Sequence, residues 1–338
     1  MRPSFYPALV NDRSGDPAVY VDFLRERRAI LFDLGEINAL PPRKILRLSD
    51  VFVSHTHVDH FIGFDRLLRL LLGRPKTLRL YGPDGFVDRV AAKLNAYTWN
   101  LVDRFADDLI FEVTELAGAG QGRRARFRLK ARFAREGEEQ IAVDDGVILS
   151  EPGLTVRFAE LTHRTPCLAY ALQETAHVNI WRNRVAELGL ALGPWLRRLK
   201  QAIQAGLPDA TPIAVETIAG ARRDLPLGQL RDRVASVTAG QKIAYVTDAG
   251  FTPANAAAIV ELARGADTLF IEAAFAGADA ALARDRAHLT AAEAGELARQ
   301  AGVARVEPFH FSPRYSGMED RLLAEAIRAF RGGMRDLS

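Results

Sequence analysis

Metal-binding side chains are concentrated in one short stretch of the chain. The heptapeptide SHTHVDH, residues 54–60, carries four residues of ligand type and directly follows an apolar run. In extended backbone, side chains two residues apart point to the same side, so His55 and His57 can chelate one ion. Asp59 and His60, at the turn into a helix, can face a second ion. The pattern predicts a two-metal site at a strand end, rather than a polar turn with surface histidines.

A site for two ions needs more ligands than one turn supplies. Three further candidates each end an apolar run of strand length: His163, Asp248 and His310. Their common position at strand ends favours a shared metal-binding role over three separate structural roles. Because imidazole and carboxylate ligands without sulfur suit Zn²⁺, we expect two divalent ions, most readily Zn²⁺, with Mn²⁺ or Fe²⁺ as alternatives.

The rest of the chain indicates which elements position these residues. The 338 residues are 48% hydrophobic and 26% charged, which is a globular composition. Apolar runs of strand length alternate with helical patterns such as 253–264 and 291–300, and this alternation predicts an α/β protein. We expect a single domain over residues 1–338, with insertions at about 112–151 and 173–240, the second of them mainly helical.

Composition also restricts the compartment and the partners. The single cysteine, Cys167, excludes a disulfide scaffold and an all-thiolate metal site and is consistent with a reducing cytoplasm. There is no run of 18 apolar residues and no signal-peptide pattern in residues 1–20, so we expect a cytoplasmic protein with no membrane partner. The net charge of +3 is too small for a general polycation. His177 matches no motif and is expected at the surface.

The motifs together resemble the metallo-β-lactamase superfamily and, within it, the ribonuclease Z branch of tRNA 3′-end endonucleases. They are FDLGE (32–36), the heptapeptide (54–60), THRTP (162–166), VTD (246–248), IEAAF (271–275), HLT (288–290) and HFSPRY (310–315). The later motifs, with Glu272, His288 and His310, are more specific to this branch than the heptapeptide is. The resemblance implies a four-layer αββα sandwich. The family's N-terminal Gly-Thr-Gly loop is missing, and its Gly-x-Pro-x-Gly-Pro arm element has only a partial counterpart in residues 189–194.

The resemblance also implies a role for each matched residue. One ion would be held by His55, His57 and His163, the other by Asp59, His60 and His310, and Asp248 would bridge the two. A hydroxide bridged by the ions would attack a phosphodiester. Asp59 would receive the proton of the attacking water, and His288, oriented by Glu272, would protonate the leaving oxygen. Asp33 would brace the ligand-bearing turn through hydrogen bonds.

The substrate stays open at this stage. Residues 123–135 hold seven basic residues, and Arg124, Arg126 and Arg128 would share one face of a strand. Such a strand either follows a nucleic-acid backbone or is a solvated edge strand protected against aggregation. Arg314 is either a phosphate ligand or a structural arginine. The leading hypothesis is a ribonuclease Z-like endoribonuclease acting on a tRNA precursor, as a homodimer if it follows the family. The alternatives are a metallohydrolase of a small phosphodiester or other ester, and a non-enzymatic RNA-binding relative.

Overall fold

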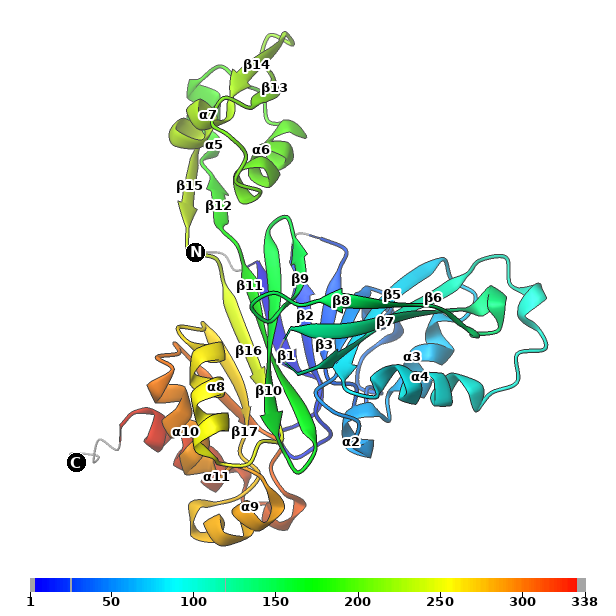
Figure 1. Cartoon of the computed structure of the whole chain (residues 1–338). Coiled ribbons are helices and arrows are strands. Elements are labelled where there is room, and N and C mark those ends of the chain that lie inside the picture. The colour runs from blue at the N-terminus through cyan, green and yellow to red at the C-terminus, as the bar shows by residue number, and fades with distance from the viewer. Residues whose placement is uncertain (1–3, 25, 119, 333–338) are drawn as a thin grey trace. The chain divides into compact units, whose positions relative to one another are not determined.

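The computed structural model describes residues 4–24, 26–118 and 120–332 (Figure 1). The chain forms two compact units. Unit 1 comprises residues 1–148, 157–171 and 243–338, and unit 2 comprises residues 149–156 and 172–242. No helix within the described residues is both long and apolar enough to cross a membrane.

The first sheet of unit 1 has eight strands in sequential order. They are β1 (Phe5–Leu9), β2 (Val19–Phe23), β3 (Ala29–Phe32), β4 (Leu48–Phe52), β5 (Lys76–Pro83), β6 (Leu109–Ala117), β7 (Gln121–Arg128) and β8 (Arg135–Ala142). The central strands β3 to β6 run parallel. Parallel strands are buried on both faces, which explains why β3 consists entirely of buried apolar residues. The expected insertion at 112–151 supplies β7, β8 and the second half of β6 in this sheet.

Helices α1 (Pro42–Ile45), α2 (Val58–Phe61), α3 (Phe64–Leu71) and α4 (Phe86–Asn95) belong to the same half of unit 1. Figure 1 shows α3 and α4 lying along the outer face of the first sheet. Their apolar sides, with Phe64 on α3 and Phe86 on α4, are buried against Leu80 and Phe111 of the sheet. This layer holds the ligand-bearing turn between β4 and α3 in place.

The second sheet has the order β18-β17-β16-β11-β10-β9. Its strands are β9 (Val147–Glu151), β10 (Leu154–Thr162), β11 (Pro166–Glu174), β16 (Lys242–Val246), β17 (Thr268–Glu272) and β18 (Val306–Phe309). Helices α8 (Pro253–Ala263), α9 (Ala280–Arg286), α10 (Ala291–Gln300) and α11 (Glu319–Phe330) accompany it. Helices α10 and α11 pack so closely at Gly295 that a Cβ atom added there would lie 2.1 Å from the Ala326 carbonyl oxygen.

The two sheets of unit 1 pack face to face through aromatic rings. Phe32 of β3 stacks on Tyr245 of β16 with ring centroids 5.5 Å apart, and Phe52 of β4 contacts Tyr170 of β11 at 5.4 Å. Aromatic contacts of this kind add to the burial of apolar area. With helices outside both sheets, the predicted four-layer αββα sandwich is confirmed. Short 3₁₀ turns are η1 (Val102–Arg104), η2 (Leu129–Ala131), η3 (Gly277–Asp279) and η4 (Pro313–Tyr315).

Unit 2 has its own small core. It contains α5 (Arg182–Glu187), α6 (Trp195–Gln204) and α7 (Leu227–Val234), the antiparallel pair β12 (His177–Ile180) and β15 (Ala235–Thr238), and the antiparallel pair β13 (Pro212–Glu216) and β14 (Arg222–Pro226). Trp195, Leu199 and Leu230 are buried together at its centre. The expectation of a mainly helical segment is incomplete, because two strand pairs hold its helices together.

Candidate metal centre

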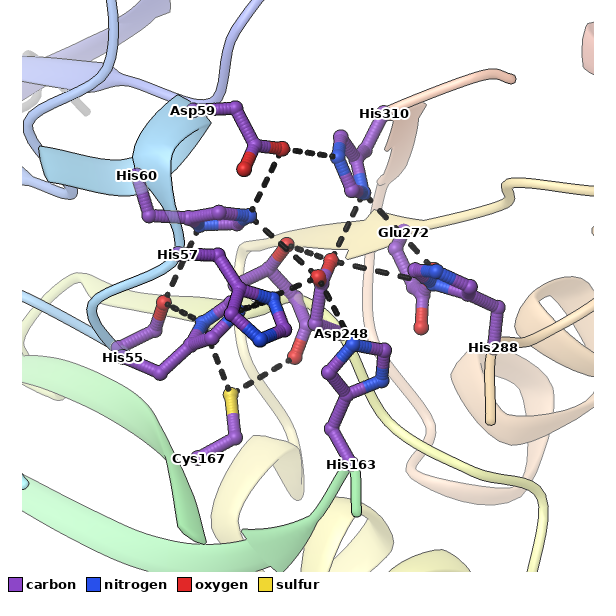
Figure 2. A network of polar contacts seen from close by, with 12 residues as sticks. His55, His57, Asp59, His60, His163, Cys167, Asp248, Glu272, His288 and His310 are labelled. Carbon is purple, nitrogen blue, oxygen red and sulfur yellow. Dashed lines mark hydrogen bonds and ion pairs between the residues drawn. The ribbon is translucent and has the colours of Figure 1, made fainter. Parts of the chain in front are cut away.

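The predicted ligands converge on one place in unit 1, although they come from four separate segments (Figure 2). His55 and His57 follow β4, Asp59 and His60 lie on α2, His163 lies between β10 and β11, Asp248 follows β16 and His310 follows β18. Strands β16, β17 and β18 are parallel, so their carboxyl ends meet at one sheet edge. Ligands in open α/β sheets are commonly bound at this edge.

One group of donor atoms contains His55, His57, His163 and Asp248, with all atoms within 4.8 Å of one another. His55 Nε2 lies 2.9 Å from His57 Nδ1 and 3.5 Å from Asp248 Oδ2. His163 Nε2 is 3.4 Å from the same carboxylate oxygen. Its Nδ1–H donates to the carbonyl oxygen of Ala287 at 2.7 Å, which turns Nε2 toward the site.

A second group contains Asp59, His60 and His310, and both of its histidines lie close to Asp248 of the first group. His60 Nε2 is 3.4 Å from both Asp59 Oδ2 and Asp248 Oδ2. His310 Nε2 is 3.4 Å from Asp59 Oδ2, and its Nδ1 is 2.8 Å from Asp248 Oδ1. Asp248 therefore contributes one carboxylate to both groups, which is the arrangement that a two-ion centre requires.

The electrostatics of the site favour a bound cation. Burial and the neighbouring His60 lower the pKa of His55 to about 2, which keeps its imidazole neutral and able to coordinate. Burial alone would lower the pKa of His60 and His310, but the adjacent carboxylates, chiefly Asp248, raise both values well above the ordinary one. These imidazoles in turn hold the pKa of Asp248 well below its usual range, although burial opposes this. Asp248 is thus kept ionised between the two groups.

A buried nitrogen without a partner provides a separate test of whether a metal fits. His60 Nε2 is inaccessible to solvent and has no hydrogen-bond partner within the described part of the chain. An unsatisfied buried polar atom costs about 1–3 kcal/mol. A cation between His60, Asp59 and Asp248 would satisfy this nitrogen and neutralise the carboxylates. The donor set therefore suits a divalent metal ion.

Asp33 supports the ligand-bearing turn from behind. Its Oδ1 accepts a hydrogen bond from the Ser54 backbone N–H at 2.6 Å. Its Oδ2 accepts from the Ser54 hydroxyl at 2.8 Å, from His60 Nδ1 at 2.8 Å and from the Tyr245 hydroxyl at 2.6 Å. Donation from His60 Nδ1 leaves Nε2 free for the site. Neither hydroxyl residue was predicted from the sequence. The position of Ser54 inside the heptapeptide could have revealed it, whereas Tyr245 is one residue of an apolar run.

Three residues of the site have strained backbone. Asp33, Asp248 and His310 have φ angles of +56°, +41° and +58°, in the left-handed region that favours glycine. Such conformations cost of the order of 1–3 kcal/mol and persist where the surrounding structure imposes them, often at functional sites. Here the strain places each side chain at its strand end with its polar atoms toward the centre.

The buried Glu272 and the half-buried His288 form a pair beside Asp248. His288 Nδ1–H donates to Glu272 Oε2 at 2.8 Å, and Glu272 Oε1 accepts from the Ala249 backbone N–H at 2.6 Å. Burial alone would lower the pKa of His288, but the Glu272 carboxylate outweighs it and raises that pKa. His288 therefore holds its proton more firmly than an ordinary histidine, and its Nε2 remains available to a substrate.

These residues open into a pocket of about 850 Å³ in unit 1. The ligands His57, Asp59, His163, Asp248 and His310 line it, together with His288. The other lining residues include the apolar Phe275 and Phe311 and the basic Arg164, Arg286 and Arg314. A cavity of this size with apolar walls and convergent polar groups is typical of a small-molecule or substrate site.

The predicted substrate-binding arginines fall into two classes. Arg314 is exposed and lines the pocket. The others lie on β7 and form ion pairs across the sheet: Arg124 with Glu139 at 3.0 Å, Arg126 with Glu112 at 2.7 Å, and Arg128 with Asp108 at 3.0 Å. Strand β7 lies between β6 and β8, so the edge-strand interpretation is wrong, although the idea that these charges are structural gains support.

The expectation that His177 lies at the surface is also wrong. It is buried in unit 2, where its Nδ1 lies 3.3 Å from Glu174 Oε2. A buried imidazole needs such a partner. The sequence contains the two residues only three positions apart but does not show that β11 and β12 bury them.

Fold and donor set together define a metal-dependent hydrolase of the metallo-β-lactamase fold. The family model described as beta-lactamase superfamily domain matches residues 198–311. The human short-form tRNase Z has the same fold, with a TM-score of 0.51 at 17% identity over 93% of this chain and 92% of that one. The protein YhfI from Bacillus subtilis gives a TM-score of 0.52 at 15% identity, over 96% of this chain and 90% of that one.

Similarity to curated proteins extends over nearly the whole chain. The ribonuclease Z of Deinococcus radiodurans is 32% identical over 328 residues, covering 95% of this chain and 94% of that protein. The ribonuclease Z of Brevibacillus brevis is 30% identical over 91% of this chain and 85% of that protein. The chain belongs to the ribonuclease Z family.

Proposed function

We propose that this chain is a dinuclear zinc endoribonuclease that cleaves a phosphodiester bond in tRNA precursors. The observation that carries the proposal is the Glu272–His288 pair, held beside two groups of metal ligands that share Asp248. The ligand groups alone would suit many hydrolases. An additional proton donor suits a reaction whose leaving group is a poor one, such as a ribose alkoxide. The curated relatives named ribonuclease Z support RNA as the substrate.

We assign the ligands as follows. His55, His57 and His163 would hold one ion, Asp59, His60 and His310 would hold the second, and Asp248 would contribute to both. Zinc is the preferred ion, because the set consists of imidazole and carboxylate donors and zinc sites commonly use both. When bound, two such ions supply Lewis acidity and an activated water. Asp33 acts as a brace by fixing His60 through its Nδ1.

The chain's own residues then divide the proton transfers. Asp59, with a carboxylate lining the pocket, accepts the proton of the attacking water. His288 gives a proton from Nε2 to the leaving oxygen, and Glu272 stabilises the positive charge that His288 carries before the transfer. Because the buried Glu272 is fixed by the Ala249 N–H, it holds the imidazole in one orientation. Arg314, at the pocket wall, contacts a substrate phosphate.

A comparison of two substrates tests the proposal. Purified protein loaded with Zn²⁺, Mn²⁺ or Fe²⁺ is assayed on a precursor tRNA and on bis(p-nitrophenyl) phosphate. We expect metal-dependent endonucleolytic cleavage of the precursor at a single position, and highest activity with Zn²⁺. Hydrolysis of the small diester without cleavage of the precursor would instead favour a small-molecule phosphodiesterase. Absence of hydrolysis with every metal would refute an enzymatic function.

A further inference from the structure

Two arginines and one aspartate gather at the rim of the pocket, outside the assigned metal ligands. Arg164 directly follows His163, while Asp285 and Arg286 lie at the end of α9, just before His288. Both arginines line the pocket that contains the metal ligands. All three side chains are about 70% exposed, so their charges are available to a substrate.

The contacts within this cluster are weak and share one carboxylate. Arg164 Nη2 lies 3.7 Å from Asp285 Oδ1, and Arg286 Nε lies 3.7 Å from Asp285 Oδ2. Both separations exceed a normal N–H···O hydrogen bond. Exposed ion pairs of this kind contribute little to stability. Two guanidinium groups therefore face one loosely held carboxylate, and the three side chains together carry a net charge of +1.

The backbone keeps this cluster beside the reacting groups. His163 Nδ1–H donates to the carbonyl oxygen of Ala287, between Arg286 and His288, and Arg164 also donates to the carbonyl oxygen of Asp285. Arg164 has a φ of +54°, a strained value that sets the direction of the chain after His163. The rings of His163 and His288 are 4.6 Å apart. The two arginines thus lie on the side of the pocket where His288 meets the leaving oxygen.

We propose that Arg164 and Arg286 form a binding site for the phosphate next to the scissile bond, on the leaving-group side, and that this phosphate displaces the Asp285 carboxylate. The proposal rests on the proposed function, since it places the site relative to His288. The non-bridging oxygens of a phosphodiester are free to approach both guanidinium groups, so they can form the short charge-assisted bonds that Asp285 does not reach. Asp285 occupies the site weakly until the substrate arrives.

The test compares ligands that differ by one phosphate. Both ligands are dinucleotides joined by a hydrolysis-resistant methylphosphonate. One carries an extra terminal phosphate on the nucleoside that would leave in the reaction, and the other does not. The dissociation constant of each ligand is measured for the wild-type protein and for each variant. The binding measurement does not depend on turnover, so failure of this inference is distinguishable from failure of the proposed function.

We expect the terminal phosphate to strengthen binding to the wild-type protein about tenfold, the effect of one hydrogen bond to a charged group. Arg286→Gln should remove most of this gain, and Arg164→Gln the remainder. Arg286→Gln is easier to interpret than Arg164→Gln, because the Arg164 side chain also donates a hydrogen bond to the backbone of Asp285. Asp285→Asn should have the opposite effect and increase the gain, since it removes the competing carboxylate. Arg299→Gln, which breaks an exposed pair with Glu296 on α10, is the matched control and should change nothing.

Two results would overturn the inference. One is equal binding of the two methylphosphonate ligands by the wild-type protein. The other is that the terminal phosphate no longer strengthens binding in Asp285→Asn. The three side chains would then serve only to connect α9 with the turn after β10. Thermal melting of each variant establishes that it is folded. If the phosphate effect holds while no substrate is hydrolysed, the site stands and the proposed function fails.

Discussion

Replacement of His288 tests the proposed reaction most directly. His288→Ala removes the proton donor but leaves Glu272 with its two backbone donors, Ala249 N–H at 2.6 Å and Leu289 N–H at 3.3 Å. The buried carboxylate therefore keeps part of its hydrogen bonding, and we expect a loss of stability of about 1–3 kcal/mol rather than unfolding. His288→Asn is a second variant whose amide can still donate to Glu272.

The expected size of the effect depends on the leaving group. General acid catalysis by a positioned side chain contributes about 10²–10⁴-fold, or roughly 3–5 kcal/mol of transition-state stabilisation. His288 is 18% exposed and is fixed by a 2.8 Å bond to Glu272, so it is positioned for this role. We therefore expect a loss of about 10²–10⁴-fold on RNA, where the leaving alkoxide must be protonated. On bis(p-nitrophenyl) phosphate the loss should be less than about tenfold, because p-nitrophenolate leaves without a proton.

The assay measures kcat/KM for both substrates and the metal content of each variant. His177→Ala is the matched control, since it removes a buried histidine from a pair with Glu174 in unit 2, outside the pocket. In this variant, kcat/KM for the small diester should stay within about twofold of the wild-type value, because His177 is not among the residues that line the pocket. Equal losses on RNA and on the small diester in His288→Ala, with metal content unchanged, would refute the assignment of His288 as the acid.

Three further predictions concern the metals, their support and the basic strand. Elemental analysis of protein from metal-supplemented growth should give close to two ions per chain, and removal by a chelator should abolish hydrolysis; a metal-free, active protein would contradict the ligand assignment. Tyr245→Phe removes the 2.6 Å bond to Asp33, so metal affinity measured by competition with a chromophoric chelator should fall about 10–100-fold. An unchanged affinity would show that Ser54 and His60 orient Asp33 without the tyrosine. Replacing Arg124, Arg126 and Arg128 with Gln should leave the salt dependence of tRNA binding almost unchanged, because carboxylates already pair with these charges. If the slope of log binding constant against log salt concentration flattened by about two units or more, these arginines would instead belong to the surface that binds RNA.

Local spacing in the sequence was sufficient to identify the core of the metal centre. Within residues 54–60 the distance along the chain determines the distance in space, since an extended strand followed by a helical turn leaves little freedom. The spacing therefore indicated which side chains would meet before any tertiary contact was known. The αββα sandwich was predictable for a different reason, because motifs distributed from Phe32 to Tyr315 resemble one family and a family shares its fold.

Only the tertiary structure decided how residues far apart in the sequence are paired. Asp33 and Tyr245 are separated by 212 positions and share a hydrogen bond because two sheets stack there. Arg124 and Arg126 are neutralised because the register of β6, β7 and β8 puts glutamates opposite them. His177 is buried because β12 pairs with β15 in unit 2. In each case the partner is set by strand pairing or layer packing over long range, and neither composition nor local spacing carries that information.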